Sequence, residues 1–448
     1  MSDILQGMDL LQFLQEASVE ELRAALKEIH PADILDALED YKGDAIAFLA
    51  KLPNEILAEI IEEAEEEDKS GIFDLFPMDQ KKEIISEMAS DELVDLLETI
   101  DPEERADLIG SLDAEDAQDV KDLMLHDPET AGGIMATEFV TIKDNMTVRE
   151  TLEYLQIHGD EAETLSYLYV LDEDEVLKGV ISLRDIVVNE FNELIAPLIK
   201  SNVISVRPEL DQEEVATTFQ KYGFTSMPVV DENNKMLGII TSDDVLDVLV
   251  DESTEDFEKM AAISHSDGEY LETGVFELAR KRIFWLLFLM ISATFTSVII
   301  QSYESALASI VILAAFIPML MDTGGNAGSQ SATLIIRGMA LGEIDLKDYF
   351  QVFWKEVRVS LIVGVVLAVV NFFRIWLFNH DILLAMTVSL SLLFTVVLAK
   401  TVGCTLPIVA RKFKIDPAIM AAPIITTIVD VLSLLVYFKL AVTFYKII

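Results

Sequence analysis

Long apolar runs with few charges fill the chain from residue 281 onward. They cover Ile283 to Ile300, Ser305 to Ile336, about Val359 to Phe378, Ile382 to about Val409, and Pro417 to Phe438. A helix needs about 20 mostly apolar residues to cross the hydrocarbon core of a bilayer, and these runs are of that order. The pattern therefore predicts an α-helical transmembrane domain of five helices in residues 281–448.

Basic residues gather in three of the segments that flank these runs. They lie before the first run, between the second and third, and between the fourth and fifth: Lys281, Arg282, Arg337, Lys347, Lys355, Arg358, Arg411, Lys412 and Lys414. Loops rich in Lys and Arg stay in the cytosol. We therefore expect a multi-pass protein of the plasma (inner) membrane, with its N-terminus in the cytosol and its C-terminus outside. The first residues, MSDILQGMDLLQ, lack the basic region and cleavage site of a secretory signal.

A different periodicity marks residues 1–130. Prolines recur at Pro31, Pro53, Pro77, Pro102 and Pro128, in steps of 22 to 26 residues. In HPADILDALEDY, LPNEILAEIIEE and DPEERADLIGSL the proline precedes an apolar-periodic stretch, which is a helix-start signal. The spacing predicts stacked helices that form an all-α, acidic, superhelical N-domain.

Residues 131–250 contain two copies of one pattern. FVTIKDNMTVRETLEYLQIHGD resembles NVISVRPELDQEEVATTFQKYGF, and YVLDEDEVLKGVISLRDI resembles PVVDENNKMLGIITSDDV. Each copy reads as short strands and helices around a turn rich in Asp or Asn, which predicts a tandem α/β domain. Residues 251–280 predict a connecting helix, then a Gly-containing break before the first span; an ordinary linker helix is the alternative.

Charge divides the chain at the same place. Residues 1–280 hold 70 acidic and 19 basic residues, whereas residues 281–448 hold 9 and 13. Phosphate binding needs basic side chains, so the acidic excess excludes nucleic acid as a partner. Hard divalent cations prefer carboxylate oxygens, although a solvated surface explains the average carboxylate equally well. Cys404 is the single cysteine, so an intrachain disulfide and a thiolate metal cluster are excluded.

Asp430 lies in the middle of the fifth apolar run. An isolated carboxylate at that depth is costly unless it faces water, an ion or a partner, so a role in ion permeation is the first interpretation. Ala422 and Thr426 share its helical face at four-residue spacing and suit a wet path. The alternative is an internal ion pair with Lys400 or Lys439.

The second run ends in MDTGGNAGSQSATLIIRG, where glycine, amide and hydroxyl side chains replace Leu and Ile. A break at Gly324, Gly325 and Asn326 would turn backbone carbonyls toward a cation, with Asp322 nearby. The same small residues also permit close helix packing, which needs no ion.

The repeat in residues 131–250 resembles a pair of cystathionine-β-synthase-type (CBS) domains, which commonly bind adenine nucleotides. The resemblance implies that Tyr167 and Phe224 stack on the base, and that Asp185 accepts hydrogen bonds from ribose hydroxyls. Arg184 is then placed to meet phosphate. Plain structural turns are the alternative.

The whole order of modules, with GGNAGSQS in the second run and DPA…TTIVD in the fifth, resembles the MgtE family of bacterial magnesium channels. The resemblance implies a homodimeric Mg²⁺ importer, with ATP as a regulatory ligand. Closure on Mg²⁺ binding to the cytosolic domains and to a connecting (plug) helix is also implied. It implies pore residues Asp430, Thr426, Ala422, Gly324, Gly325 and Asn326, and cytosolic Mg²⁺ ligands Asp91, Asp95, Asp211, Glu213, Asp244, Asp247, Glu252, Glu255, Asp256 and Asp416.

Two other functions remain open from the sequence. A coupled secondary transporter of Mg²⁺, Mn²⁺ or Co²⁺ would use the same acid as an alternating-access site. A membrane sensor that transports nothing needs neither Asp430 nor an interrupted second span. An enzyme is disfavoured, because the chain has no nucleophile elbow, phosphate loop or paired catalytic motif.

Overall fold

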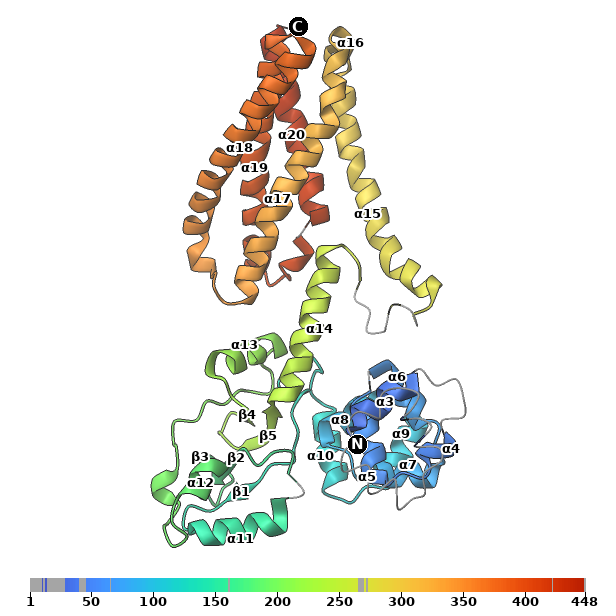
Figure 1. The fold of residues 1–448 in the computed structure, drawn as a ribbon, viewed down its shortest axis with the longest axis vertical. Coiled ribbons are helices and arrows are strands. Elements are labelled where there is room, and N and C mark those ends of the chain that lie inside the picture. Colours follow the sequence, from blue (N-terminus) through green and yellow to red (C-terminus); the bar gives the residue numbers. More distant parts are fainter. Residues whose placement is uncertain are drawn as a thin grey trace. The chain divides into compact units, whose positions relative to one another are not determined.

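A computed structural model of the chain describes residues 29–39, 46–64, 66–159, 162–264, 273–420 and 422–446, with the single positions 10, 13 and 270. The start of the predicted superhelix, apart from Leu10 and Phe13, therefore lies outside the described residues. The chain divides into two compact units, Met1–Val250 and Asp251–Ile448. Figure 1 labels the helices and strands of both units.

Short helices build the N-terminal part of the first unit. They are α3 (Pro31–Glu39), α4 (Ile46–Leu49), α5 (Asn54–Glu62), α6 (Glu66–Phe73), α7 (Met78–Ile84), α8 (Ser90–Thr99), α9 (Pro102–Ile109) and α10 (Asp116–Leu123). Pro31 and Pro102 begin helices, and Pro53 and Pro77 are N-cap residues, as their fixed φ allows. Pro128 lies in a turn instead. The predicted all-α N-domain is confirmed.

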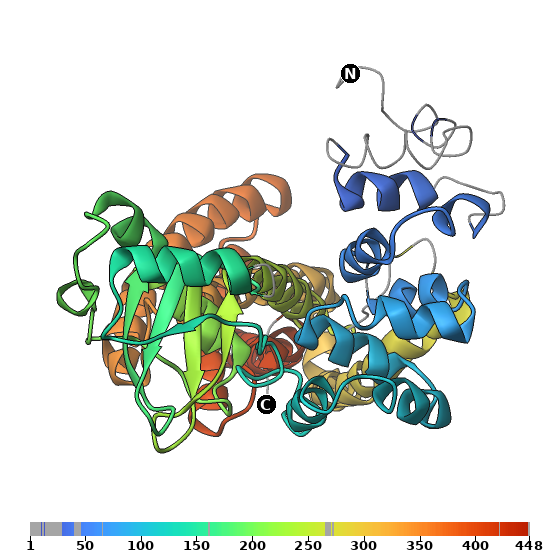
Figure 2. The ribbon, with the colours of Figure 1, turned by 90° about the horizontal axis from the view of Figure 1, so that it is seen from below.

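The two repeats form two small sheets. The first copy contains β1 (Thr141–Ile142), α11 (Val148–His158), β2 (Tyr167–Leu171), β3 (Leu177–Ser182) and α12 (Leu183–Val188), followed by the 3-10 helix η2 (Ala196–Leu198). The second contains α13 (Gln212–Tyr222), β4 (Ser226–Val230), β5 (Met236–Thr241) and the start of α14 (Ser242–Met260). β1 pairs parallel to β2, and the β2–β3 and β4–β5 pairs are antiparallel. Val148 and Leu155 of α11 pack in one core with strands β2 and β3 (Figure 2).

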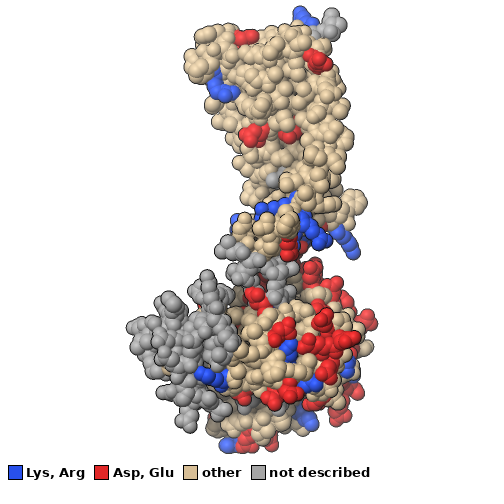
Figure 3. All heavy atoms as spheres, turned by 90° about the vertical axis from the view of Figure 1, so that its right-hand side faces the viewer, with Lys and Arg blue, Asp and Glu red and all other residues tan. Residues whose placement is uncertain are grey.

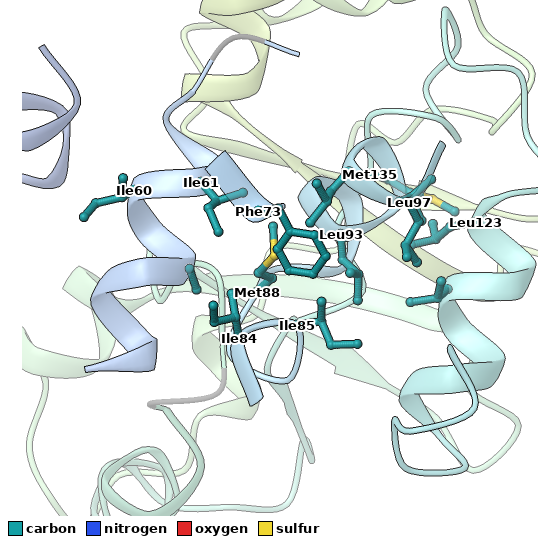
Figure 4. Close-up of a cluster of buried hydrophobic side chains, with 14 of the residues drawn as sticks. Ile60, Ile61, Phe73, Ile84, Ile85, Met88, Leu93, Leu97, Leu123 and Met135 are labelled. Atoms are coloured by element: carbon teal, nitrogen blue, oxygen red, sulfur yellow. The ribbon is translucent and has the colours of Figure 1, made fainter. Parts of the chain in front are cut away.

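A hydrophobic core joins the N-domain to the second repeat. Phe73 is fully buried and is drawn with Ile84, Met88 and Leu93 in Figure 4. The same cluster continues to Met227 and Ile240 on the strands of the second copy. Burial of this apolar surface holds the helices and the second repeat together as one folding unit.

Among the described residues, five helices of the second unit are long and apolar enough to span a membrane, as predicted. The helices are α15 (Val275–Ser302), α17 (Ile317–Ala340), α18 (Tyr349–Asn379), α19 (Ile382–Lys412) and α20 (Ala422–Tyr445). Short elements connect them: α16 (Glu304–Ser309), η3 (Val311–Phe316), η4 (Leu346–Asp348) and η5 (Ala418–Met420). On the face displayed in Figure 3, uncharged side chains cover most of the spans, as a lipid surface requires.

The second span differs from the expected interruption, because α17 runs without a break through Gly324, Gly325 and Asn326. Its glycines allow close packing instead. A Cβ on Gly324 would lie 2.8 Å from side-chain carbons of Thr395 and Val429, and one on Gly325 would lie 2.9 Å from Thr426. The alternative given above is therefore correct for this segment: its small residues allow α17 to pack closely against α19 and α20.

The connecting segment also differs in its limits. α14 begins at Ser242 inside the second repeat and continues to Met260, so the connecting helix is an extension of the repeat's last helix. The lead-in to the first span is helical from Val275. The acidic sequence alone did not indicate that this helix begins inside the second repeat.

The contact between Gly403 of α19 and Gly328 of α17 yields a stability prediction. A Cβ on Gly403 of α19 would lie 2.2 Å from the carbonyl oxygen of Gly328 on α17, so Gly403→Ala must force the helices apart. We expect a loss of about 1–3 kcal/mol, measured as a lower midpoint of thermal unfolding in detergent. Gly274→Ala is the control, because a Cβ there meets nothing within 4 Å. Equal midpoints for both variants would contradict this packing.

Candidate functional site in the membrane unit and its acidic neighbours

Asp430 is half-buried near the middle of α20. Its helical neighbours Val429 and Ser433 are buried against the other spans. Within the described residues no ion pair is formed by Asp430, and the amino group of Lys400 donates instead to Ser331 Oγ at 3.3 Å. The alternative of an internal pair between Asp430 and Lys400 is therefore wrong for this structure.

Polar side chains form a stripe along α17. Asp322, Asn326 and Gln330 follow one another at four-residue spacing, so they share one helical face, and all three are exposed in the single chain. Gly324, Gly325 and Gly328 lie buried on the opposite contact with α19 and α20. A polar face on a membrane-spanning helix needs water, an ion or a further protein surface against it.

The other predicted pore residues lie beside this contact. Thr426 is half-buried, and its hydroxyl donates to the carbonyl oxygen of Pro423 at 2.9 Å, so it is not turned toward Asp430 for a hydrogen bond. Ala422 begins α20, and its side chain lies outside the described part of the structure. Two buried hydroxyls, of Thr395 and Ser433, flank Gly324 and have no hydrogen-bond partner among the described residues. The crossing of the three helices is thus more polar than an ordinary apolar core.

Acidic groups crowd together inside the first unit. Partial burial and the nearby Asp244 carboxylate raise the pKa of Asp91 well above its ordinary value. Burial raises the pKa of Asp244 to about 6, although its carboxylate accepts hydrogen bonds from the N–H and hydroxyl of Thr241. Two of the predicted Mg²⁺ ligands, Asp91 at the start of α8 and Asp244 at the start of α14, therefore lie near each other.

The remaining predicted acids of this unit lie on the same elements or on α13. Asp95 is one turn after Asp91 on α8, and Asp247 is one turn after Asp244 on α14. Asp211 is the N-cap residue of α13, and its carboxylate accepts the backbone N–H of Glu213 at 2.9 Å. A capping role accounts for Asp211 without any ion.

A lysine occupies the acidic cluster of the second unit. Glu252, Glu255 and Asp256 lie in the last turns of α14. The ammonium of Lys259 pairs with Glu255 and lies 2.7 Å from Asp416, which precedes η5. Burial and the charge of Asp416 raise the pKa of Asp256 to about 6. In this structure a tethered cation neutralises the carboxylates for which a divalent ion was expected.

No group of three or more His, Cys, Asp or Glu side chains in the described residues has an arrangement that holds a metal ion. The acids outside the spans are therefore brought near one another only in pairs and loose clusters.

The predicted nucleotide residues lie mainly on the first repeat. Tyr167 begins β2, and Arg184 and Asp185 lie in the first turn of α12. Lys200 Nζ lies 3.2 Å from Oδ2 of Asp185, yet this buried oxygen has no hydrogen-bond partner in the described residues. It remains able to accept from a ligand hydroxyl. Phe224, from the second repeat, stacks on Tyr222 with ring centres 5.3 Å apart.

Several charged residues near these sites escaped the sequence analysis. Burial raises the pKa of Glu62 to about 7, and desolvation with the charge of Asp244 raises the pKa of Glu163 to about 7. Both join the cluster around Asp91. Lys200 and Lys259 supply the two counter-charges described above. Residues distant in sequence meet here only through the fold, and no local motif marks them.

Comparison with known proteins gives a consistent result. The family described as divalent cation transporter (MgtE) matches residues 317–440, the MgtE intracellular N domain matches residues 29–129, and the CBS domain matches residues 120–190 and 195–251. The chain is 38% identical to a protein named magnesium transporter MgtE from Thermus thermophilus, over 97% of each chain. It is 34% identical to one of the same name from Bacillus subtilis, over 97% of this chain and 96% of that one.

Solved structures resemble the first unit. One is the soluble part of a magnesium transporter, with 36% identity, a TM-score of 0.52, and 55% of this chain matched to 96% of that one. Another is the cytosolic domain of a Mg²⁺ channel, MgtE, in complex with ATP. It is 38% identical, with a TM-score of 0.50, and covers 53% of this chain and 98% of that one.

The crowded acids predict a pH dependence. Asp244, Glu62 and Glu163 have pKa values of about 6 to 7 in the folded state, above their ordinary values. The folded state then binds more protons than the unfolded state between about pH 4 and 7, so stability falls as pH rises through that window.

In the full chain with chelator, we expect amide exchange in α8 and early α14 to quicken from pH 5.5 to 8, after correction for intrinsic rates. Saturating Mg²⁺ should reduce the change. Equal protection across this range in chelator would contradict the crowding.

Proposed function

Since the chain belongs to the MgtE family of divalent cation transporters, we propose that it is a magnesium-selective channel that imports Mg²⁺ across the plasma membrane. In this proposal residues 1–130, 131–250, 251–280 and 281–448 are the N-domain, the CBS pair, the connecting helix and the pore domain. The N-terminus is cytosolic and the C-terminus is outside, as the positive loops favour.

The observation that carries permeation is the state of Asp430. A carboxylate in the middle of a span, without an ion pair in the described residues, is stable there when it faces water or a cation. The exposed stripe of Asp322, Asn326 and Gln330 on α17 adds oxygen ligands at similar depth. Together these groups can bind a hydrated Mg²⁺ without removing its waters.

A second copy of the chain accounts for the uncovered polar faces. Asp430 is only half-buried and the α17 stripe is exposed in one chain, which lipid cannot cover at acceptable cost. In a homodimer with a central path, two copies of each would face one another. No residue of α15 is buried within the chain, which leaves that helix for lipid or the partner subunit.

Closure by Mg²⁺ follows from the crowded acids of the first unit and of α14. At low Mg²⁺ the carboxylates around Asp91 and Asp244 repel one another. Bound Mg²⁺ offsets that repulsion and favours a compact state in which α14 holds the pore closed. A change from 1:99 to 99:1 needs about 5.5 kcal/mol of differential binding, which several weak sites can supply jointly.

Nucleotide regulation is supported by the donor and acceptor set of the first repeat. Oδ2 of Asp185, which pairs with Lys200 but accepts no hydrogen bond in the described residues, fits a ribose hydroxyl. Arg184 fits a phosphate, and Tyr167 offers a ring face. A relative's cytosolic domain is known with ATP. ATP bound here would add contacts between the two repeats and so change the Mg²⁺ concentration at which the pore closes.

The first test addresses the pore. Asp430→Ala should abolish Mg²⁺ uptake into proteoliposomes, because the path loses its charged ligand, while size-exclusion behaviour stays unchanged. Glu343→Gln, an exposed loop acid, is the control and should keep uptake. If the Asp430→Ala variant took up Mg²⁺ at the wild-type rate, Asp430 would not be a pore ligand. Single-channel currents from the wild type separate a channel from a coupled carrier, which passes no ion bursts.

The second test addresses closure. Replacing Asp91 and Asp244 together by Asn removes two Mg²⁺ ligands, and it also removes the repulsion that opposes the compact state. Uptake should therefore respond less to internal Mg²⁺, with the concentration for half-closure shifted by about fivefold or more. The measurement is uptake into liposomes loaded with increasing Mg²⁺. Asp174→Asn, in an exposed turn, should keep the wild-type midpoint. An unchanged midpoint in the double variant would exclude these acids as sensors.

A further inference from the structure

Three side chains from three different spans form a polar chain inside the membrane unit. Lys400 of α19 donates to Ser331 Oγ of α17 at 3.3 Å, and Ser331 Oγ donates to Glu356 Oε2 of α18 at 2.5 Å. Ser331 is fully buried and Lys400 is 5% exposed. The Ser331 hydroxyl thus accepts from the Lys400 ammonium and donates to the Glu356 carboxylate, so both of its hydrogen bonds are charge-assisted.

This chain of bonds lies close to the helix that carries Asp430. Gly328, one turn before Ser331 on α17, contacts Ile425 of α20 and the carbonyl of Ala399, the residue before Lys400. Ile425 is five residues before Asp430, and Ser331 is a further turn along α17. At 1.5 Å of rise per residue, the Ser331 level is about 12 Å from the level of Asp430.

A positive charge at that distance affects any cation held by Asp430. The interaction between two charges about 12 Å apart persists where packed protein rather than bulk water lies between them, and its effect on a divalent ion is twice that on a monovalent one. Among the described residues, Glu356 is the acid that the hydrogen-bonded chain links to Lys400. Loss of Glu356 would leave the lysine charge unneutralised, whereas loss of Lys400 would leave an extra negative charge.

We propose that Glu356 is a positioning residue that, through Ser331, holds and neutralises Lys400, and so keeps a fixed positive charge from weakening divalent cation binding at Asp430. The inference rests on the proposed function. A merely structural tie between α17, α18 and α19 is the competing explanation. It predicts harm from loss of either charge, because a buried ion left alone destabilises the fold.

The two explanations differ in the sign of the single variants. We would measure initial Mg²⁺ uptake against external Mg²⁺ in proteoliposomes for Glu356→Gln, Lys400→Met, Ser331→Ala and the Glu356→Gln/Lys400→Met double variant. Thermal unfolding and size exclusion would report folded protein. Glu356→Gln should raise the half-saturating Mg²⁺ concentration at least about tenfold. Lys400→Met should not raise it, and the double variant should return it close to wild type.

Each outcome decides the inference. Equal losses of folded protein in both single variants, with wild-type half-saturation in the remainder, would overturn it in favour of the structural tie. If Glu356→Gln does not fold, Ser331→Ala carries the test, because it removes the hydroxyl that holds the Lys400 ammonium to the Glu356 carboxylate. The ammonium is then no longer held beside its counter-charge, and half-saturation should rise, by less than in Glu356→Gln. Wild-type half-saturation in Ser331→Ala would then overturn the inference. If Asp430→Ala transports normally, the proposed function itself fails, which is distinct from failure of the Lys400 assignment.

Discussion

A charged group in the hydrocarbon layer must keep water, an ion or an opposite charge beside it, and this constraint organises the membrane unit. Lys400 satisfies it inside the protein, through Ser331 and Glu356. Asp430 has no such partner among the described residues and remains half-buried. The difference separates a charge used for internal neutralisation from one left available to a cation.

The acidic groups outside the spans follow the same electrostatics in a wetter setting. Asp91 and Asp244 are buried near other carboxylates, which raises their pKa values. The ammonium of Lys259 offsets the negative charge of Glu255 and Asp416. Protons, a lysine and divalent ions are therefore interchangeable ways to stabilise crowded carboxylates.

Sequence reasoning predicted the modules well, because periodicity and loop charge are local signals. Five spans, the proline-initiated helices and the repeated α/β pattern were all predicted, and they are confirmed. The predicted interruption of the second span at Gly324 was wrong. A glycine in the sequence is compatible both with a break in the helix and with close packing of a neighbouring helix, and the structure has the second. Lys259 and the Lys400–Ser331–Glu356 contact were beyond sequence reasoning, because the partners are far apart in the chain and meet only after packing.

The central claim is that water reaches Asp430 within the bilayer. Cys404 is the single native cysteine, so a Cys404→Ala background allows one thiol to be placed at will. A charged, water-soluble thiol reagent should modify Asp430→Cys in reconstituted protein, but should spare Leu435→Cys on an exposed apolar position of the same helix. No modification of Asp430→Cys, with reaction only by a lipid-soluble reagent, would contradict the account.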